Sequence, residues 1–222
     1  MKPRVAIIGA SGHGIVLADA VQAGCVFELA GFFDTGGAGC ARVDLPGAFL
    51  GAAIESKAQL MALGIEGVFL GIGDNFSRQK CWERLGAILP ETYFPVLVHP
   101  RAAVSASARL ANGSVVLAGA MVGPGAEVGE FALLNTGSSL DHHGEMGRFS
   151  SLAPGAFTGG CVQLGEGTAI GMGVQVIHGR RVGANSVVGA GSVVLRDVPD
   201  GVVAFGVPAR VIRTRNAGEK YL

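Results

Sequence analysis

The chain has 222 residues, of which 37 are glycine and only 15% are charged. Seventeen Lys and Arg balance seventeen Asp and Glu, and this zero formal net charge argues against electrostatic binding to nucleic acid or to an anionic membrane. With 49% hydrophobic residues and nine prolines the chain is neither disordered nor collagen-like, so the glycine excess must serve a folded structure.

Two further exclusions follow from the sequence as a whole. No apolar run approaches the roughly eighteen residues of a membrane helix, and the glycine-broken start is unlike a signal peptide, so we expect no membrane span. The four cysteines are scattered without CxxC spacing, which predicts reduced, mostly core thiols in a cytoplasmic protein. They are Cys25, Cys40, Cys81 and Cys161.

The first part of the chain, residues 1–92, alternates short apolar strands with helices and is predicted to be one domain. The predicted strands are 5–8, 27–33 and 68–70, and the predicted helices are 15–23, 54–63 and 76–85. Strands that alternate with helices indicate a small, Rossmann-like parallel sheet with a crevice at the strand ends.

A glycine loop, GASGHG at residues 9–14, follows the first predicted strand. Backbone N–H groups at such a helix start can hold a phosphate, and Asp34 at the end of the next strand could accept hydrogen bonds from a ribose or a base. The spacing is not GxGxxG, and the domain has room for only half a dinucleotide fold, which favours a nucleotide-linked sugar over NAD. Alternatively, Asp34 is only a turn or cap residue.

The second part, residues 93–222, has a period of six. From Val98 to Val194, every sixth residue is Leu, Ile, Val or Met with the single exception of Thr158. The fourth residue after each aliphatic is usually small. The residue directly after each aliphatic is often glycine, which we expect at corners of unusual backbone geometry. This period predicts a β-solenoid whose three six-residue sides form an eighteen-residue coil.

The motif Asp141-His142-His143 stands out within this solenoid. Because Leu140 occupies the inward aliphatic position, His142 and His143 should project outside the coil. An exposed histidine beside an acid can act as a general base near neutral pH. Two solvated surface histidines, or a zinc site, are the alternatives; no histidine pair has HxxxxH spacing, so no metal is expected.

Several motifs together resemble one family. They are GASGHG, Phe33-Asp34, GIGDN followed by Arg78, His99-Pro100, NTGSSLDH at 135–142, and GVPAR at 206–210. In this order they resemble the two-domain sugar acetyltransferases of the NeuD/PglD type, among them the UDP-4-amino-sugar N-acetyltransferase of bacillosamine biosynthesis. The resemblance implies a left-handed parallel β-helix of hexapeptide repeats, acetyl-CoA as co-substrate, and a homotrimer with active sites between subunits.

The resemblance also implies roles for individual residues. His142 would be the general base. Ser11, Gly12, His13, Asp34 and Gly73 fall where the family binds the nucleotide sugar, and Ser151, Met172 and Ala190 fall where it binds acetyl-CoA.

This sequence departs from the family pattern at three positions. His143 stands where the base is usually followed by Asp or Glu, so either His143 or Asp141 would modulate the base, or His143 would itself be the base. Ser151 replaces a histidine that is common in relatives. Thr35 replaces the second aspartate of a uridine-binding relative, which leaves UDP, dTDP and GDP all open.

We therefore expect an N-acetyltransferase that acetylates the amine of a nucleotide-linked 4-amino-4,6-dideoxy sugar by direct attack on the thioester. An O-acetyltransferase acting on sialic acid or a related sugar is the alternative within the family. A non-catalytic nucleotide-sugar-binding solenoid and a metal-dependent solenoid enzyme are alternatives from other classes.

Overall fold

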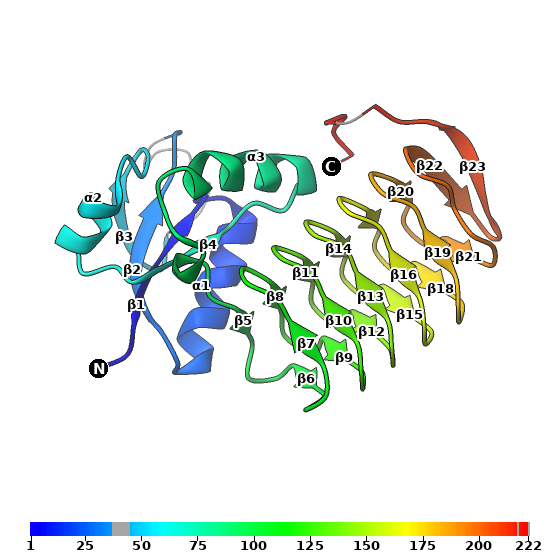
Figure 1. Ribbon diagram of the computed structural model, residues 1–222, viewed down its shortest axis with the longest axis horizontal. Helices are drawn as coiled ribbons and strands as arrows, with labels where there is room; N and C mark the ends of the chain where they lie inside the picture. The colour runs from blue at the N-terminus through cyan, green and yellow to red at the C-terminus, as the bar shows by residue number, and fades with distance from the viewer. Residues whose placement is uncertain (37–44, 217, 222) are drawn as a thin grey trace.

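The computed structural model describes residues 1–36, 45–216 and 218–221 of the chain. An N-terminal part with helices around a small sheet adjoins a long solenoid of stacked coils (Figure 1). The last element of the N-terminal part ends at Tyr93, and the first solenoid strand begins at Leu97. None of the described helices is long and apolar enough to cross a membrane.

The N-terminal sheet has four parallel strands in the order β3-β2-β1-β4. Its elements are β1 (Arg4–Ile8), α1 (Gly12–Gly24), β2 (Glu28–Phe33), β3 (Ala48–Gly51), α2 (Lys57–Ala62), β4 (Gly67–Leu70), α3 (Asn75–Gly86) and the short 3-10 helix η2 (Glu91–Tyr93). The three predicted strands and three predicted helices are present, and β3 is an additional edge strand.

Burial explains why the central strands could be identified from the sequence. Val5, Ala6 and Ile7 of β1 are fully buried, which is typical of a parallel strand covered on both faces. Helix boundaries were less accurate: α1 begins at Gly12, three residues before the predicted start. The edge strand β3, which was not predicted, has two exposed residues and no buried one.

The solenoid has short strands on three sides. One side holds β5 (Leu97–Val98), β8 (Val115–Val116), β11 (Leu133–Leu134), β14 (Ser151–Leu152), β17 (Ala169–Ile170), β20 (Val187–Val188) and β22 (Val202–Gly206), to which β23 (Ala209–Thr214) adds antiparallel. The second side holds β6 (Ala103–Val104), β9 (Met121–Val122), β12 (Ser139–Leu140), β15 (Phe157–Thr158), β18 (Gln175–Val176) and β21 (Val193–Val194). The third side holds β7 (Arg109–Leu110), β10 (Glu127–Val128), β13 (Glu145–Met146), β16 (Gln163–Leu164) and β19 (Arg181–Val182).

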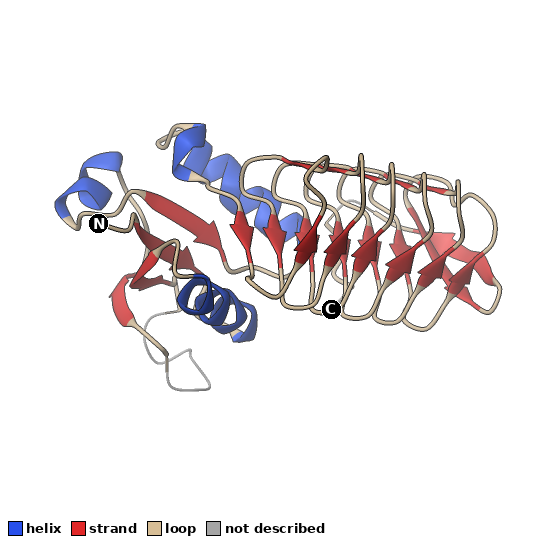
Figure 2. Cartoon of the chain, turned by 90° about the horizontal axis from the view of Figure 1, so that it is seen from below, coloured by secondary structure: helices blue, strands red, loops and turns tan. Residues whose placement is uncertain are grey.

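Strand pairing confirms the eighteen-residue coil. Leu134 pairs with Leu152, and Leu152 pairs with Ile170, so each residue stacks on the one eighteen positions later. Figure 2 shows the resulting rungs, which form a left-handed parallel β-helix. The periodic aliphatics fill the interior; Leu134, Leu140 and Leu152 are fully buried.

The glycines after the aliphatics do a different job from the one predicted. Gly123 does not have a positive φ; a Cβ there would lie 2.6 Å from the backbone nitrogen of His142 in the next coil. The left-handed corner position lies two residues later, as at Gly125 with φ +66°. The glycine excess therefore has two causes, close stacking of coils and positive φ at corners.

The three sides of the solenoid face different surroundings. On the first side (the β11/β14 side), outward residues such as Leu133 and Val115 are buried against the N-terminal part. The outward row of the third side (the β10/β13 side) is polar and exposed: Arg109, Glu127, Glu145, Gln163 and Arg181. The second side (the β12/β15 side) carries no charge in its outward row, where Met121 and Phe157 are 54% and 48% exposed.

Arg78 of α3 joins the N-terminal part to the solenoid. Its guanidinium is buried and donates to the carbonyls of Phe131 and Phe149, which occupy the same corner of successive coils, both at 3.0 Å. It also donates to Ile72 and Gly73 carbonyls and to Asn75 Oδ1. All its donors thus have partners, which is how a buried charge is tolerated; burial nevertheless lowers the pKa of Arg78 to about 10.

The cysteine prediction was partly wrong. Cys25, Cys81 and Cys161 are free thiols, as expected, but Cys25 and Cys161 are exposed rather than in the core. Both have a positive φ, Cys25 at the end of α1 and Cys161 at a corner of the solenoid. Cys40 lies outside the described residues.

Candidate active site

His142 and His143 lie in the corner that joins β12 to β13, outside the coil as predicted. His142 is half-buried and His143 is exposed. Their Nδ1 atoms are 3.2 Å apart, and their rings are nearly perpendicular at 81°. Because one of these nitrogens must donate and the other accept, the contact couples the tautomers of the two rings.

The tautomer has a direct chemical consequence. When His142 donates its Nδ1 proton to His143, its Nε2 has a free lone pair and can accept a proton from a substrate. With the opposite arrangement, Nε2 of His142 carries the proton and cannot act as a base. His143 is thus placed where it can set the basic nitrogen of His142.

Asp141 contacts the backbone rather than the ring of its neighbour. Its Oδ1 accepts the backbone N–H of His142 at 2.6 Å, and its own N–H donates to Thr158 Oγ1 at 3.2 Å. These bonds order the corner from which the imidazole projects.

Two residues of later coils complete the surroundings of His142, and sequence reasoning missed both. Gly160 lies directly against the imidazole, since a Cβ there would be 2.2 Å from Nε2. The ring of His178 is 5.9 Å from that of His142, centroid to centroid. The eighteen-residue period could have identified them, because Gly160 and His178 follow His142 by one and two coils.

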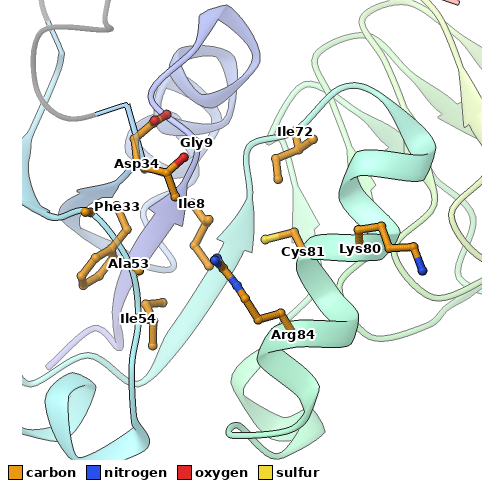
Figure 3. Close-up of a pocket in the computed structure, with 12 residues that line it drawn as sticks. Ile8, Gly9, Phe33, Asp34, Ala53, Ile54, Ile72, Lys80, Cys81 and Arg84 are labelled. Carbon is orange, nitrogen blue, oxygen red and sulfur yellow. The ribbon is translucent and has the colours of Figure 1, made fainter. Parts of the chain in front are cut away.

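A first cavity of about 380 Å³, which we call the strand-end cavity, opens at the carboxyl ends of β1 and β2. Gly9, Asp34 and Thr35 line it together with Lys80, Cys81 and Arg84 of α3. Figure 3 shows Arg84 extending toward the strand ends, whereas Lys80 points away from them. Lys80 and Arg84 were not predicted as site residues, because they reach the strand-end cavity only when α3 packs beside the carboxyl ends of the strands.

Asp34 holds the glycine loop in place. Its Oδ2 accepts the N–H of Ala10 at 2.6 Å and its Oδ1 accepts the N–H of Gly36 at 2.8 Å. Both carboxylate oxygens therefore have backbone partners, and each retains a further lone pair for a ligand. The loop is also tight, because a Cβ at Gly14 would lie 2.0 Å from the Gly9 carbonyl oxygen.

The other predicted nucleotide-sugar residues lie at the start of α1 and in the loop after β4. Ser11 and Gly12 are exposed at the helix N-terminus, beside the strand-end cavity but not in its lining. His13 is half-buried, and burial together with the nearby Arg78 charge lowers its pKa to about 4, so the ring is neutral at physiological pH. Gly73 lies elsewhere, in the second cavity.

The second cavity, of about 340 Å³, runs along the first side of the solenoid and its corner toward the second side; we call it the solenoid cavity. It contains all three predicted coenzyme residues, Ser151, Met172 and Ala190. Its walls are largely apolar, from Leu133, Leu152, Ala169, Ile170 and Val187.

Tyr221 of the C-terminal tail also lines the solenoid cavity, which sequence reasoning missed. Its hydroxyl accepts the N–H of Asn75 at 3.1 Å, so the chain end returns to the start of α3, as Figure 1 shows. Burial raises the pKa of its phenol, and the nearby Ser151 hydroxyl acts in the opposite direction. Nothing in the sequence indicates that Tyr221 contacts Ser151 and Asn75, which lie 70 and 146 positions earlier in the chain.

No group of three or more metal-ligating side chains is present among the described residues. His142, His143 and His178 are close together, but they do not form such a group.

Comparison with protein families identifies both parts of the chain. Residues 4–85 match the PglD N-terminal domain, and residues 161–196 match the bacterial transferase hexapeptide family. The two matches lie in the parts that contain the strand-end cavity and the solenoid cavity.

Two solved structures resemble the chain over almost its whole length. PerB from Caulobacter crescentus, solved with CoA and GDP-perosamine, is 35% identical with a TM-score of 0.83, and the match covers 93% of this chain and 96% of PerB. The acetyltransferase domain of PglB from Neisseria gonorrhoeae, solved with acetyl coenzyme A, is 30% identical with a TM-score of 0.82, covering 96% of this chain and all of that domain.

Two curated relatives match over a smaller share of the chain. The galactoside O-acetyltransferase of Lactococcus lactis is 53% identical over 55 residues, which is 25% of this chain and 27% of that protein. Serine acetyltransferase 2 of Arabidopsis thaliana is 32% identical over 121 residues, 54% of this chain and 33% of that protein. The chain thus spans about a quarter to a third of these curated relatives. With structural matches over more than nine-tenths of the chain and matches to both domain families, the chain belongs to the NeuD/PglD-type family of hexapeptide-repeat sugar acetyltransferases, whose members use acetyl-CoA.

Proposed function

We propose that the protein transfers the acetyl group of acetyl-CoA to the amine of a nucleotide-linked 4-amino-4,6-dideoxy sugar. The observation that carries this proposal is the 3.2 Å contact between the Nδ1 atoms of His142 and His143, which places a half-buried imidazole where its partner ring can select its tautomer. The relative PerB was solved with GDP-perosamine and CoA, which supports this class of substrate.

In the proposed reaction the sugar amine attacks the thioester carbonyl directly. The new C–N bond forms while Nε2 of His142 takes the amine proton, and the C–S bond then breaks to release CoA, whose thiolate receives that proton. A positioned base of this kind contributes typically 10²–10⁴-fold to the rate. His143 accepts a hydrogen bond from the Nδ1–H group of His142 and thereby stabilises the tautomer in which Nε2 is free. Asp141 orders the corner through its hydrogen bond to the backbone N–H of His142.

The nucleotide is proposed to bind at the strand-end cavity, with its phosphates near the N–H groups of Ser11, Gly12 and His13 at the start of α1. Asp34 and Thr35 border the same cavity. Acetyl-CoA is proposed to bind in the solenoid cavity beside Ser151, Met172 and Ala190. Gly73 lines the latter and thereby connects the two sites.

A homotrimer supports this arrangement better than a monomer does. Within one chain, the solenoid cavity lies at one corner of the second side, and His142 lies at its other corner. The uncharged second side, with Met121 and Phe157 exposed, offers a face for a second subunit. Packing there would bring His142 of one subunit toward the solenoid cavity of its neighbour.

The test is release of free thiol from acetyl-CoA in the presence of UDP-, dTDP- and GDP-linked 4-amino sugars, with sialic acid as the hydroxyl acceptor. We expect turnover with an amino sugar and a loss of 10²–10⁴-fold for H142N, with coenzyme binding unchanged. Transfer to sialic acid alone would instead indicate an O-acetyltransferase. Binding without any thiol release would indicate a non-catalytic protein, and loss of activity on chelation would indicate a metal enzyme. The cytoplasmic location expected from the sequence stays a prediction.

A further inference from the structure

The wall of the solenoid cavity is completed by a residue from outside the solenoid. Four coils contribute small and aliphatic side chains, whereas Tyr221 arrives from the chain end and contributes an aromatic ring and a hydroxyl. Acetyl-CoA is proposed to bind in this cavity, and the role inferred for Tyr221 rests on that proposed function.

Tyr221 is held from two directions. Its hydroxyl accepts the Asn75 N–H at 3.1 Å, and the Arg215 guanidinium lies 5.3 Å from the ring centroid. Arg215 is itself fixed to the solenoid, because it donates to the carbonyl of Asn185 at 2.9 Å. Asn75 is anchored as well, through its side-chain donation to the Thr168 carbonyl at 3.0 Å. The ring is therefore a fixed part of the wall.

The position of the ring along the solenoid identifies the part of the coenzyme that it faces. Tyr221 lies beside Ser151, and His142 precedes Ser151 by nine residues, which is half a coil. One coil rises by a strand spacing, so His142 and Ser151 differ in height by only roughly 2–3 Å. Met172 and Ala190 lie about one and two coils higher.

In a trimer whose threefold axis runs parallel to the solenoid, each residue keeps its height in every subunit. The His142 of a neighbour would then face the solenoid cavity at the height of Ser151 and Tyr221. Because the base must lie next to the reacting carbonyl, the acyl group belongs at this height, and the nucleotide of the coenzyme belongs at the end near Ala190.

We propose that Tyr221 determines the size of the acyl group, because its ring fills the acyl end of the cavity next to Gly73 and Ser151. Removing the ring enlarges the cavity, whose other walls, Leu133 among them, are largely apolar. Extra methylene groups of a longer acyl chain can enter this space, each favouring binding by about fourfold. The hydroxyl is not needed for this effect, since it is the ring that occupies the volume.

The test compares kcat/KM for acetyl-CoA, propionyl-CoA and butyryl-CoA in the unmodified protein, Y221A and Y221F. We expect the butyryl-to-acetyl ratio to rise by about 16-fold in Y221A, from two methylene groups at about fourfold each, and to stay unchanged in Y221F. Tyr93, which lies on η2 outside the solenoid cavity, gives a matched control: Y93A should keep the original ratio.

Thermal unfolding checks that Y221A is folded. A folded Y221A with the original ratio would overturn the proposal, and so would an equal rise in Y221F. If the unmodified protein transfers no acyl group at all, the proposed function fails instead. The same three coenzymes can then be compared by calorimetry, where unchanged relative affinities in Y221A would overturn the proposal on their own.

Discussion

The imidazole of His142 lies against Gly160, one coil further along the solenoid. A Cβ at position 160 would be 2.2 Å from Nε2 and 2.3 Å from Cε1 of that ring. A side chain cannot occupy this space without displacing the imidazole, so the next coil of the solenoid determines where Nε2 of His142 lies.

This relationship predicts that G160A lowers kcat by about tenfold or more while leaving the fold intact, because small displacements of a catalytic group are costly. Steady-state kinetics with the acceptor and acetyl-CoA measure the effect. G86A, at the end of α3, is the control, since its nearest contact would be an ordinary 3.7 Å to Trp82. Equal activity of G160A and G86A would contradict the assignment of His142.

Replacing His143 tests whether it determines which ring nitrogen of His142 carries the proton. Position 143 has a φ of 54°, which Asp and Asn tolerate better than other residues. In H143D the carboxylate accepts the Nδ1 proton and favours the charged form of His142. We expect the acid limb of the kcat profile to move to higher pH and the plateau to be maintained or raised.

H143N is the matched control, because its amide oxygen can also accept a hydrogen bond from the Nδ1–H group of His142 but carries no charge. Its acid limb should stay where that of the unmodified protein lies. A complete loss of activity in H143D and H143N alike would indicate that His143, rather than His142, is the base.

Removing Arg78 should strongly destabilise the protein. R78M would leave the carbonyls of Phe131 and Phe149 and the Asn75 amide without their buried donor, which costs at least about 3 kcal/mol of unfolding free energy. R109M removes an exposed ion pair with Glu127 and should cost less than about 1 kcal/mol. Urea unfolding followed by circular dichroism compares the two; similar midpoints would refute the role of Arg78.

The second side of the solenoid predicts the oligomeric state. F157E places a charge on the exposed, uncharged face, so we expect a change from trimer to monomer with loss of activity. Q163E places a charge on the already polar third side and should stay trimeric and active. Light scattering measures the mass, and a trimeric F157E would show that this face is not the interface.

The lowered pKa of His13 predicts a pH dependence of stability. An unfolded histidine takes up its proton near pH 6.5, whereas folded His13 does so only at about 4. The unfolded state therefore binds more protons between these values, and the free energy of unfolding falls as the pH falls from 6.5 to 4. Above 6.5 the contribution is constant.

NMR titration should place the midpoint of His13 near 4. In H13Q the pH dependence of unfolding between 6.5 and 4 should be shallower than in the unmodified protein. A midpoint near the ordinary value would show that Arg78 and burial do not act on this ring.

The sequence by itself determined the solenoid, because a six-residue period places every inward residue without reference to distant contacts. Leu140 had to point inward, and His142 therefore had to point outward. The strand, glycine loop and helix around Gly9 and Gly14 were also local patterns. The motifs further indicated the family, which the comparisons confirm.

Tertiary structure decided what the period could not express. Gly123 and Gly125 look alike in sequence, yet one allows a coil to approach and the other adopts a positive φ, which depends on the neighbouring coil. Gly160 and His178 acquire their roles only when coils stack on His142. Tyr221 reaches Asn75 and Ser151 only because the chain turns back through β22 and β23. Contacts between residues so far apart in the chain depend on how the elements pack. Packing follows no repeat in the sequence, so a sequence pattern cannot predict these contacts.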